Sequence, residues 1–168
     1  MIQNASLNVL NGGKSMDIKI EEDLVLLNIK AKDKVEVISK LANLLRKEGC
    51  VKDSYLNAVI KREGIFPTGL PTIPQSIAIP HTDAEHCLKT SVAVATLEEP
   101  VKFGLMGDDI NTVDAKAVFL LAVDNKEKQV MFLSKLFHIF DDSNSLVKIL
   151  NAKKPKEIVD ELLRAIQS

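Results

Sequence analysis

The sequence predicts an α/β protein in which a mixed sheet of about five strands is flanked by helices on both faces. Short apolar runs rich in β-formers alternate along the chain with segments that carry an apolar stripe at helical spacing. Residues 115–123 are apolar nearly throughout, which is typical of a strand buried on both faces. With 168 residues, 46% of them hydrophobic and 27% charged, the chain is long enough to bury such a core in one domain.

The chain begins with a weakly patterned segment that leads to a strand. Residues 1–16 are rich in Asn, Ser and Gly, and we interpret them as a flexible leader or a short edge hairpin. The single domain is then expected to span residues 17–168. Its first strand is expected over residues 24–30, a short apolar run of β-formers.

Two helices are expected next. Asp33 is a suitable N-cap for the first, which ends near Glu48 and is followed by Gly49 as a C-cap. The apolar stripe of this helix is formed by five residues at helical spacing: Val37, Ile38, Leu41, Leu44 and Leu45. Asp53 is expected to cap the second helix, which runs to Gly64.

A loop and the remaining strands follow. Residues 64–75 cannot form a regular helix or a central strand, because they contain several residues that interrupt both: Pro67, Gly69, Pro71 and Pro74. Residues 77–79 predict a short strand, which Pro80 ends. A strand over residues 91–97, with 101–103 as a short extension or partner, precedes the buried apolar run described above.

The C-terminal third of the chain predicts helices. Their apolar stripes cover three segments: residues 127–140, 146–150 and the segment that Pro155 opens at a first helical position. The segment 127–140 is apolar on more than half of its circumference, so we expect it to be well buried.

The composition excludes several classes of function. Twenty-two basic and twenty-three acidic residues give a net charge of −1, which argues against electrostatic binding of nucleic acid or anionic lipid. Two cysteines, Cys50 and Cys87, form no CxxC pair, which favours a reducing compartment. No apolar run approaches the roughly 20 residues of a membrane span, and the first residues lack the pattern of a signal peptide. We therefore expect a cytoplasmic protein without membrane insertion.

The segment from Arg62 to His86 carries the residues best suited to chemistry. Two of the three histidines, His81 and His86, lie in it, and His81 directly follows the strand-ending Pro80. Ligands gather at strand ends in open α/β sheets, so a histidine there is presented to solvent on a rigid base. A neutral imidazole is a nucleophile near pH 7 and can accept a phosphoryl group.

Arg62 is the natural partner for such a group. The chain uses Lys for 19 of its 22 basic residues, yet an arginine stands at the end of the helix that leads into the proline-rich loop. A guanidinium group is planar, stays protonated and matches the geometry of phosphate oxygens.

Two other interpretations of the histidine segment remain open from spacing alone. A metal site is one, because the segment offers ligands of suitable types: His81, Asp83, Glu85, His86 and Cys87. That spacing matches no familiar zinc motif, and consecutive residues of one short loop seldom converge on one ion. The other interpretation is a hydrogen-bonded histidine at a strand end, followed by solvated side chains.

Several short motifs between Arg62 and Gly107 are similar to those of a known family. Residues 77–81, Ile-Ala-Ile-Pro-His, resemble the phosphorylation signature of the type-2 (fructose/mannitol superfamily) enzyme IIA domains of the phosphoenolpyruvate-dependent sugar phosphotransferase system of bacteria. Several further features resemble the galactitol-specific branch of this family. They are Arg62-Glu63, the loop 66–70 (Phe-Pro-Thr-Gly-Leu), His86, and 100–103 (Pro-Val-Lys-Phe) followed by Met106-Gly107. The resemblance covers roughly residues 17–167 and implies the mannitol-type IIA fold, a mixed sheet flanked by helices.

The resemblance also implies a function. His81 would accept a phosphoryl group from the histidine phosphocarrier protein and pass it to a cysteine of a cognate enzyme IIB, with the membrane enzyme IIC as an indirect partner. Arg62 would bind the phosphoryl oxygens. No nucleotide, metal or nucleic acid is required, and galactitol or a related polyol is the expected sugar.

The sequence departs from mannitol- and fructose-type relatives at one position. These carry a second active-site histidine near the start of the helix after the buried strand, where this chain has Gln129. The Gln129 amide can donate to a phosphoryl oxygen but cannot titrate. We take His86 as the candidate for a second imidazole.

Some roles stay undecided at this stage. Glu63 either orients Arg62 or is solvated, whereas His138 and Cys87 are expected to be a surface and a structural residue. The expected partner-facing residues are Phe66, Leu70 and Ile73. An alternative function is a regulatory module of the same fold, similar to nitrogen-type IIA proteins, which binds a partner according to its phosphorylation state and delivers no sugar. Transfer to a IIB cysteine would separate the two functions.

Overall fold

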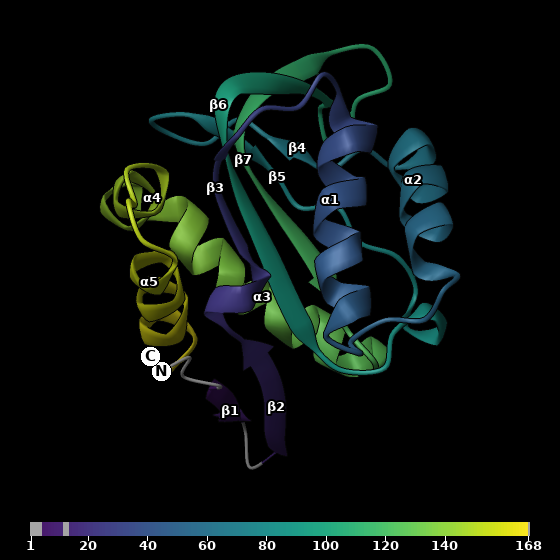
Figure 1. Ribbon diagram of the computed structural model, residues 1–168, viewed down its shortest axis with the longest axis vertical. Helices are drawn as coiled ribbons and strands as arrows, with labels where there is room; N and C mark the ends of the chain where they lie inside the picture. Colours follow the sequence, from purple (N-terminus) through teal and green to yellow (C-terminus); the bar gives the residue numbers. More distant parts are fainter. Residues whose placement is uncertain (1–4, 12–13, 168) are drawn as a thin grey trace.

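The computed structural model describes residues 5–11 and 14–167. In this part of the chain one sheet contains seven strands: β1 (Ala5–Asn11), β2 (Lys14–Ile20), β3 (Val25–Ile29), β4 (Gly69–Leu70), β5 (Ser76–Ala78), β6 (Ser91–Gly104) and β7 (Thr112–Ala122). The strand order is β1-β2-β6-β7-β5-β4, and β3 also pairs with β6 (Figure 1). Parallel and antiparallel pairs both occur, so the predicted mixed sheet is confirmed.

Helices cover both faces of this sheet. They are α1 (Lys34–Lys47), α2 (Tyr55–Ile65), α3 (Lys126–Asp141), α4 (Ser143–Leu150) and α5 (Pro155–Gln167), with short 3₁₀ turns η1 (Glu22–Leu24) and η2 (Ala84–His86). Helices α1 and α2 lie on one side of the central strands, and α4 and α5 lie on the other (Figure 1). Among the described residues, none of the helices combines the length and apolar character that a membrane crossing needs.

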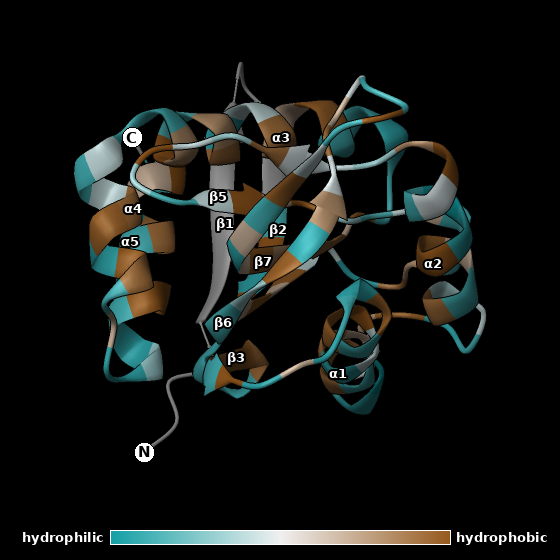
Figure 2. Ribbon diagram, turned by 90° about the horizontal axis from the view of Figure 1, so that it is seen from above, coloured by the Kyte–Doolittle hydropathy of each residue, from teal (hydrophilic) through white to brown (hydrophobic). Residues whose placement is uncertain are grey.

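The central strands β6 and β7 supply side chains to a core on each face. On β7, Phe119 and Leu121 belong to the cluster that includes α3, α4 and α5, whereas Val118 and Leu120 belong to the cluster with α1 and α2. This alternation explains why the run is apolar nearly throughout. Figure 2 shows that α5 carries both hydrophobic and hydrophilic stretches, as expected of a helix that buries one side.

One predicted helix cap is confirmed and the other is wrong. The Asp33 side chain accepts a hydrogen bond from the Glu36 N–H at 2.9 Å and caps α1. The N-cap of α2 is Ser54, one residue later than predicted. Asp53 instead forms an exposed ion pair with Arg46, 2.8 Å from its Nε, across the α1–α2 connection.

Strand β6 is longer than either of the two short strands predicted there. Its pairing with β7 is continuous from Ser91 to Thr96 and resumes at Val101, with a shift in register between them. Pro100 lies in this interruption, where its missing N–H group removes no ladder hydrogen bond.

The N-terminal segment pairs as a hairpin where the structure describes it. β1 and β2 are antiparallel, and β2 joins β6 through Lys19 and Ser91. Residues 1–4 and 12–13 of the expected leader lie outside the described residues. β2 crosses position 17, where the sequence predicted the domain to begin, and this division of the chain stays a prediction.

Candidate active site

His81 stands at the carboxyl end of β5, held from two sides. The Ile79 N–H donates to the Thr68 carbonyl at 3.2 Å, and the Leu121 N–H donates to the Pro80 carbonyl at 3.1 Å. The two residues before His81 are therefore tied both to the loop after α2 and to β7. The rigid base expected for this histidine is present.

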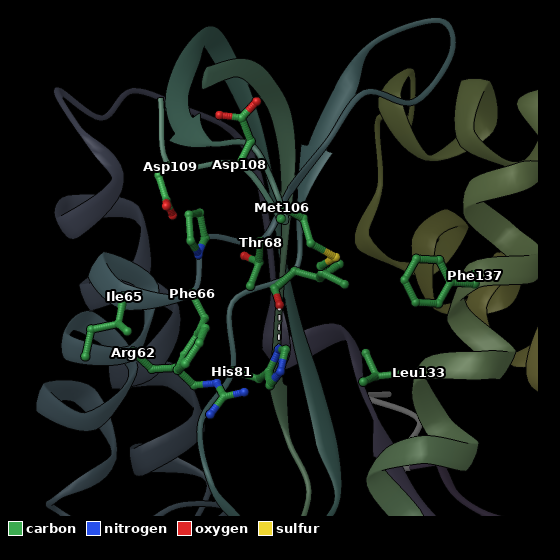
Figure 3. A pocket seen from close by; sticks show the side chains of 13 residues that line it. Arg62, Ile65, Phe66, Thr68, His81, Met106, Asp108, Asp109, Leu133 and Phe137 are labelled. Atoms are coloured by element: carbon green, nitrogen blue, oxygen red, sulfur yellow. Dashed lines mark hydrogen bonds between the residues drawn. The ribbon is translucent and has the colours of Figure 1, made fainter. Parts of the chain in front are cut away.

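The ring of His81 is fixed in one tautomer. Its Nδ1 lies 2.8 Å from the Ile79 carbonyl oxygen, the bond drawn as a dashed line in Figure 3. A carbonyl oxygen only accepts, so Nδ1 carries the proton and donates it. The lone pair is then on Nε2, the nitrogen that is free to react.

The surroundings keep this ring neutral. Burial lowers the pKa of His81 most strongly, and the positive charge of Arg62 lowers it further. The hydrogen bond to Ile79 and the negative charge of Asp83 act in the opposite direction but do not prevail. A neutral nucleophile is therefore favoured below the ordinary histidine pKa of 6.5.

Arg62, in the last turn of α2, has its guanidinium directed toward the His81 ring (Figure 3). Its Nη1 lies 3.6 Å from Oδ1 of Asp83, and its Cζ lies 5.3 Å from the ring centroid of Phe66. Its Nε is buried and has no hydrogen-bond partner. A buried donor without a partner costs free energy, so an arriving anion at this place would be stabilised.

His81 and Arg62 line a common cavity of about 470 Å³. The other lining residues come from the end of α2 and the loop after it, the end of β5, the β6–β7 connection and α3: Ile65, Phe66, Pro67, Thr68, Ile79, Met106, Gly107, Asp108, Asp109, Leu133 and Phe137. Leu133 and Phe137 form an apolar wall across from Arg62 (Figure 3). Asp108 is engaged by its own loop, where it accepts from the N–H groups of Ile110 and Asn111.

Glu63 does neither of the two things that the sequence left open. It is buried, and its carboxylate accepts the Thr68 N–H at 2.9 Å and the Thr68 hydroxyl at 2.8 Å. Burial raises the pKa of Glu63, although both bonds from Thr68 oppose the change. Its role is to fasten the loop after α2 back onto the helix that carries Arg62.

The chain is similar in sequence and fold to known proteins. Residues 19–165 match the family described as "Phosphoenolpyruvate-dependent sugar phosphotransferase system, EIIA 2". The chain belongs to this family. It is an enzyme IIA domain, a phosphotransferase component of that system.

Three relatives illustrate the range of similarity. The galactitol-specific EIIA component of Escherichia coli K12 is 34% identical over 105 residues, 62% of this chain and 69% of that protein. The mannitol-specific EIICBA component of the same strain is 31% identical over 147 residues, 86% of this chain but only 22% of that protein. The solved complex of enzyme IIAMTL and phosphorylated enzyme IIBMTL from Escherichia coli matches with a TM-score of 0.70 and 27% identity, covering 88% of this chain and 99% of that one.

Within this IIA domain, His86 is outside the cavity. Its Nδ1 lies 2.8 Å from the Ser54 hydroxyl at the start of α2, and its Nε2 lies 3.5 Å from Glu85. Ser54 and Arg62 are eight residues apart on α2, which is about 12 Å along a helix. The predicted role of His86 as a second imidazole therefore finds no support in the geometry.

Gln129 lies on a helix face that reaches the His81 cavity, whereas His86 does not. It lies in the first turn of α3, half-buried, four and eight residues before Leu133 and Phe137. Residues at this spacing share one helix face, and the other two line the cavity. Gln129 thus lies one turn before Leu133 on this helix face, although it is not itself among the residues that line the cavity.

The remaining predicted residues are placed as follows. Cys87 is buried, and burial raises the pKa of its thiol to about 11, which makes it unreactive. His138 is exposed, as predicted. In the described part of the chain, acidic ligands gather at Glu21, Asp23 and Glu48 rather than around His81, so the metal interpretation of the histidine segment lacks a geometric basis.

Sequence reasoning missed the residues that close the cavity from the far side. Leu133 and Phe137 carried no signal beyond the apolar stripe of α3. Met106 and Gly107 were noticed only as part of the family resemblance. Ile65 was expected in the proline-rich loop 64–75, whereas it is the last residue of α2 and lines the cavity beside Phe66.

Proposed function

We propose that this enzyme IIA domain carries a phosphoryl group on Nε2 of His81. The observation that supports this most directly is the pairing of two unsatisfied groups in one cavity. Nδ1 of His81 is committed to the Ile79 carbonyl, which leaves the lone pair on Nε2. Beside it, the buried Nε of Arg62 lacks a partner. A phosphoryl group would bond to the nucleophilic Nε2 and would accept a hydrogen bond from the guanidinium cation of Arg62.

The donor is the phosphorylated histidine phosphocarrier protein. The lone pair of Nε2 forms the new P–N bond while the P–N bond of the donor breaks, and those electrons return to the donor's ring nitrogen. The proton on Nδ1 stays in place, and the Ile79 carbonyl stabilises the positive charge that develops on the ring. The reaction needs positioning and charge stabilisation only, so no nucleotide or metal takes part.

The acceptor is a cysteine of a cognate enzyme IIB, with the membrane enzyme IIC acting further along. Support comes from the related mannitol proteins, whose solved complex contains a IIA domain and a phosphorylated IIB. Exposed apolar side chains near the site suit a transient contact. Phe66 lines the cavity and is 60% exposed, whereas Ile73, 73% exposed, and the partly buried Leu70 line a second hollow that shares Phe137 with the first.

Gln129 is the second contact that we propose for the phosphoryl group. Its amide lies on the α3 face that lines the cavity and can donate one hydrogen bond to an oxygen. Galactitol or a related polyol is the proposed sugar, on the strength of the 34% identity with a galactitol-specific component. The sugar itself need not touch this domain.

The test is intact-mass spectrometry after incubation with phosphoenolpyruvate, the general phosphotransferase enzyme and the histidine phosphocarrier protein. We expect one acid-labile phosphoryl group on the wild-type chain and none on His81→Ala. His138→Ala is the matched control, since it removes an exposed histidine and should leave the adduct intact. An adduct that survives in His81→Ala would overturn the assignment.

A second step separates sugar delivery from regulation. The phosphorylated domain is mixed with the candidate IIB protein, and the masses of both chains are followed. Rapid transfer to a IIB cysteine is the result expected of a sugar carrier. A phosphoryl group that stays on His81 with every IIB partner of the host would favour the regulatory function.

A further inference from the structure

Asp83 is the carboxylate that meets Arg62 in the unphosphorylated domain. Its Oδ1 lies 3.6 Å from Nη1 of Arg62, and among the described residues this is the ion pair that Arg62 makes. The Asp83 side chain is 71% exposed, whereas that of Arg62 is 35% exposed. Asp83 is also two residues after His81, and its charge acts on the His81 ring.

A phosphoryl group on Nε2 of His81 would compete with Asp83 for Arg62. It carries more negative charge than a carboxylate, and its three oxygens suit the planar fork of a guanidinium. The same group would be repelled by a carboxylate held close to it. The two anions therefore cannot both keep their best contact with Arg62.

The ion pair between Arg62 and Asp83 is weak enough for a phosphoryl group to replace it. An ion pair at 3.6 Å with one partner mostly exposed contributes little, because water and salt screen it. The rest of Arg62 is held independently, since its stem belongs to α2 and its Cζ lies over Phe66. Losing Asp83 leaves the guanidinium where it is and frees its outer nitrogen.

We propose that Asp83 is a positioning residue that occupies Arg62 in the unphosphorylated domain, yields it to the phosphoryl group, and so limits the stability of the phosphohistidine. The proposal rests on the proposed function. A carrier must release what it accepts, so every interaction that favours the phosphorylated state also opposes onward transfer. Asp83 lowers this stability without removing Arg62 from the transfer reaction.

The test measures the phosphorylation equilibrium of Asp83→Asn. Wild-type and variant domains are mixed with known ratios of phosphorylated and free histidine phosphocarrier protein, and the phosphorylated fraction is read by intact mass. We expect the equilibrium to move toward the phosphorylated variant by about two- to fivefold, within the range that an exposed ion pair gives. Spontaneous hydrolysis of its phosphohistidine should be slower. Asp83→Glu should return both values toward wild type.

Two controls show whether the effect passes through Arg62. Glu85→Gln removes an exposed carboxylate from the same loop whose partner is His86, so its equilibrium should match wild type. In an Arg62→Gln background, Asp83→Asn should lose most of its effect. An unchanged equilibrium in Asp83→Asn, or a shift toward the free domain, would overturn the role of Asp83 alone. A wild-type domain that takes no phosphoryl group would instead overturn the proposed function.

Discussion

His81 and His86 are five residues apart in the chain and have opposite surroundings. His81 has one ring nitrogen bonded to the Ile79 carbonyl and the other available beside Arg62. His86 has Ser54 at one ring nitrogen and Glu85 near the other. One histidine is therefore poised to gain a partner, whereas the other already has its partners.

The difference follows from the backbone between them. Ile79 and Pro80, which follow β5, are hydrogen-bonded to the loop after α2 and to β7, so His81 stays at the end of the sheet. The turn η2 then carries the chain toward the first turn of α2, where the His86 carbonyl accepts the Lys52 N–H at 2.9 Å. Both histidines contact regions around α2, but at opposite ends of that helix. The proposed function therefore assigns different roles to the two histidines according to the end of α2 that each one faces.

The largest effect that would test this comparison is expected from Arg62→Gln. The substitution removes the cation beside His81, and we expect the rate of phosphoryl acceptance to fall about 100-fold, as for loss of one preorganised donor. Single-turnover transfer from the phosphorylated phosphocarrier protein measures it. Arg46→Gln is the matched control, because Arg46 pairs with Asp53 on the α1–α2 connection and should keep wild-type rates. Equal losses in both variants would contradict the assignment.

Glu63→Gln is expected to act next, through the loop rather than through the phosphoryl group. A glutamine can present only one oxygen to the two donors of Thr68, so one buried hydrogen bond is lost. The expected loss in the free energy of unfolding is about 1–3 kcal/mol. Denaturant titration measures it, with the exposed Glu99→Gln as the control, for which a loss below about 0.5 kcal/mol is expected. A neutral result would show that the clamp is dispensable.

Part of this site was predictable from the sequence because it depends on local chain features. Pro80 ends a strand, a histidine follows it, and one of only three arginines in a lysine-rich chain stands at the helix end before the proline-rich loop. The fold class was equally accessible, since the buried run at 115–123 and the helical stripes alternate in a regular way. Each of these signals is a short local pattern in the chain and needs no knowledge of the tertiary structure.

The parts that could not be predicted depend on packing between distant segments. Leu133 and Phe137 form a wall of the cavity because α3 packs against one face of the sheet, the face on which Phe119 and Leu121 of β7 lie. No local pattern in the sequence specifies this packing. The bond between Glu63 and Thr68 depends on how the proline-rich loop folds back. The position of His86 depends on the direction that η2 takes. The resemblance to the galactitol-specific branch and the short distance along the chain from His81 had suggested that His86 belonged to the site.

A smaller effect is expected from pH. Burial and Arg62 lower the pKa of His81, so the ring should stay neutral and able to accept a phosphoryl group below pH 6.5. Because the unfolded chain then binds more protons at this group, its contribution to stability declines as the pH falls from about 6.5 through the lowered pKa. An NMR titration of the His81 ring measures the shift.

Two substitutions sharpen this result, because both charged neighbours act on His81. Arg62→Gln should raise the pKa of His81, and Asp83→Asn should lower it further. Asp108 and Asp109 also line the cavity and are present in both variants. If the pKa of His81 stays the same in both variants, the charges of Arg62 and Asp83 do not contribute to it.

The smallest effect on transfer is expected from His86→Ala. Its ring is held by Ser54 at the start of α2, about 12 Å along the helix from Arg62, so it can serve the fold without serving the phosphoryl group. Phosphoryl acceptance should change by less than about twofold, whereas stability should fall by about 0.5–1.5 kcal/mol, the net value of one hydrogen bond. Transfer kinetics and thermal melting of the same sample measure both. A tenfold slower transfer with unchanged stability would reverse the comparison, because His86 would then have to reach the cavity during the reaction.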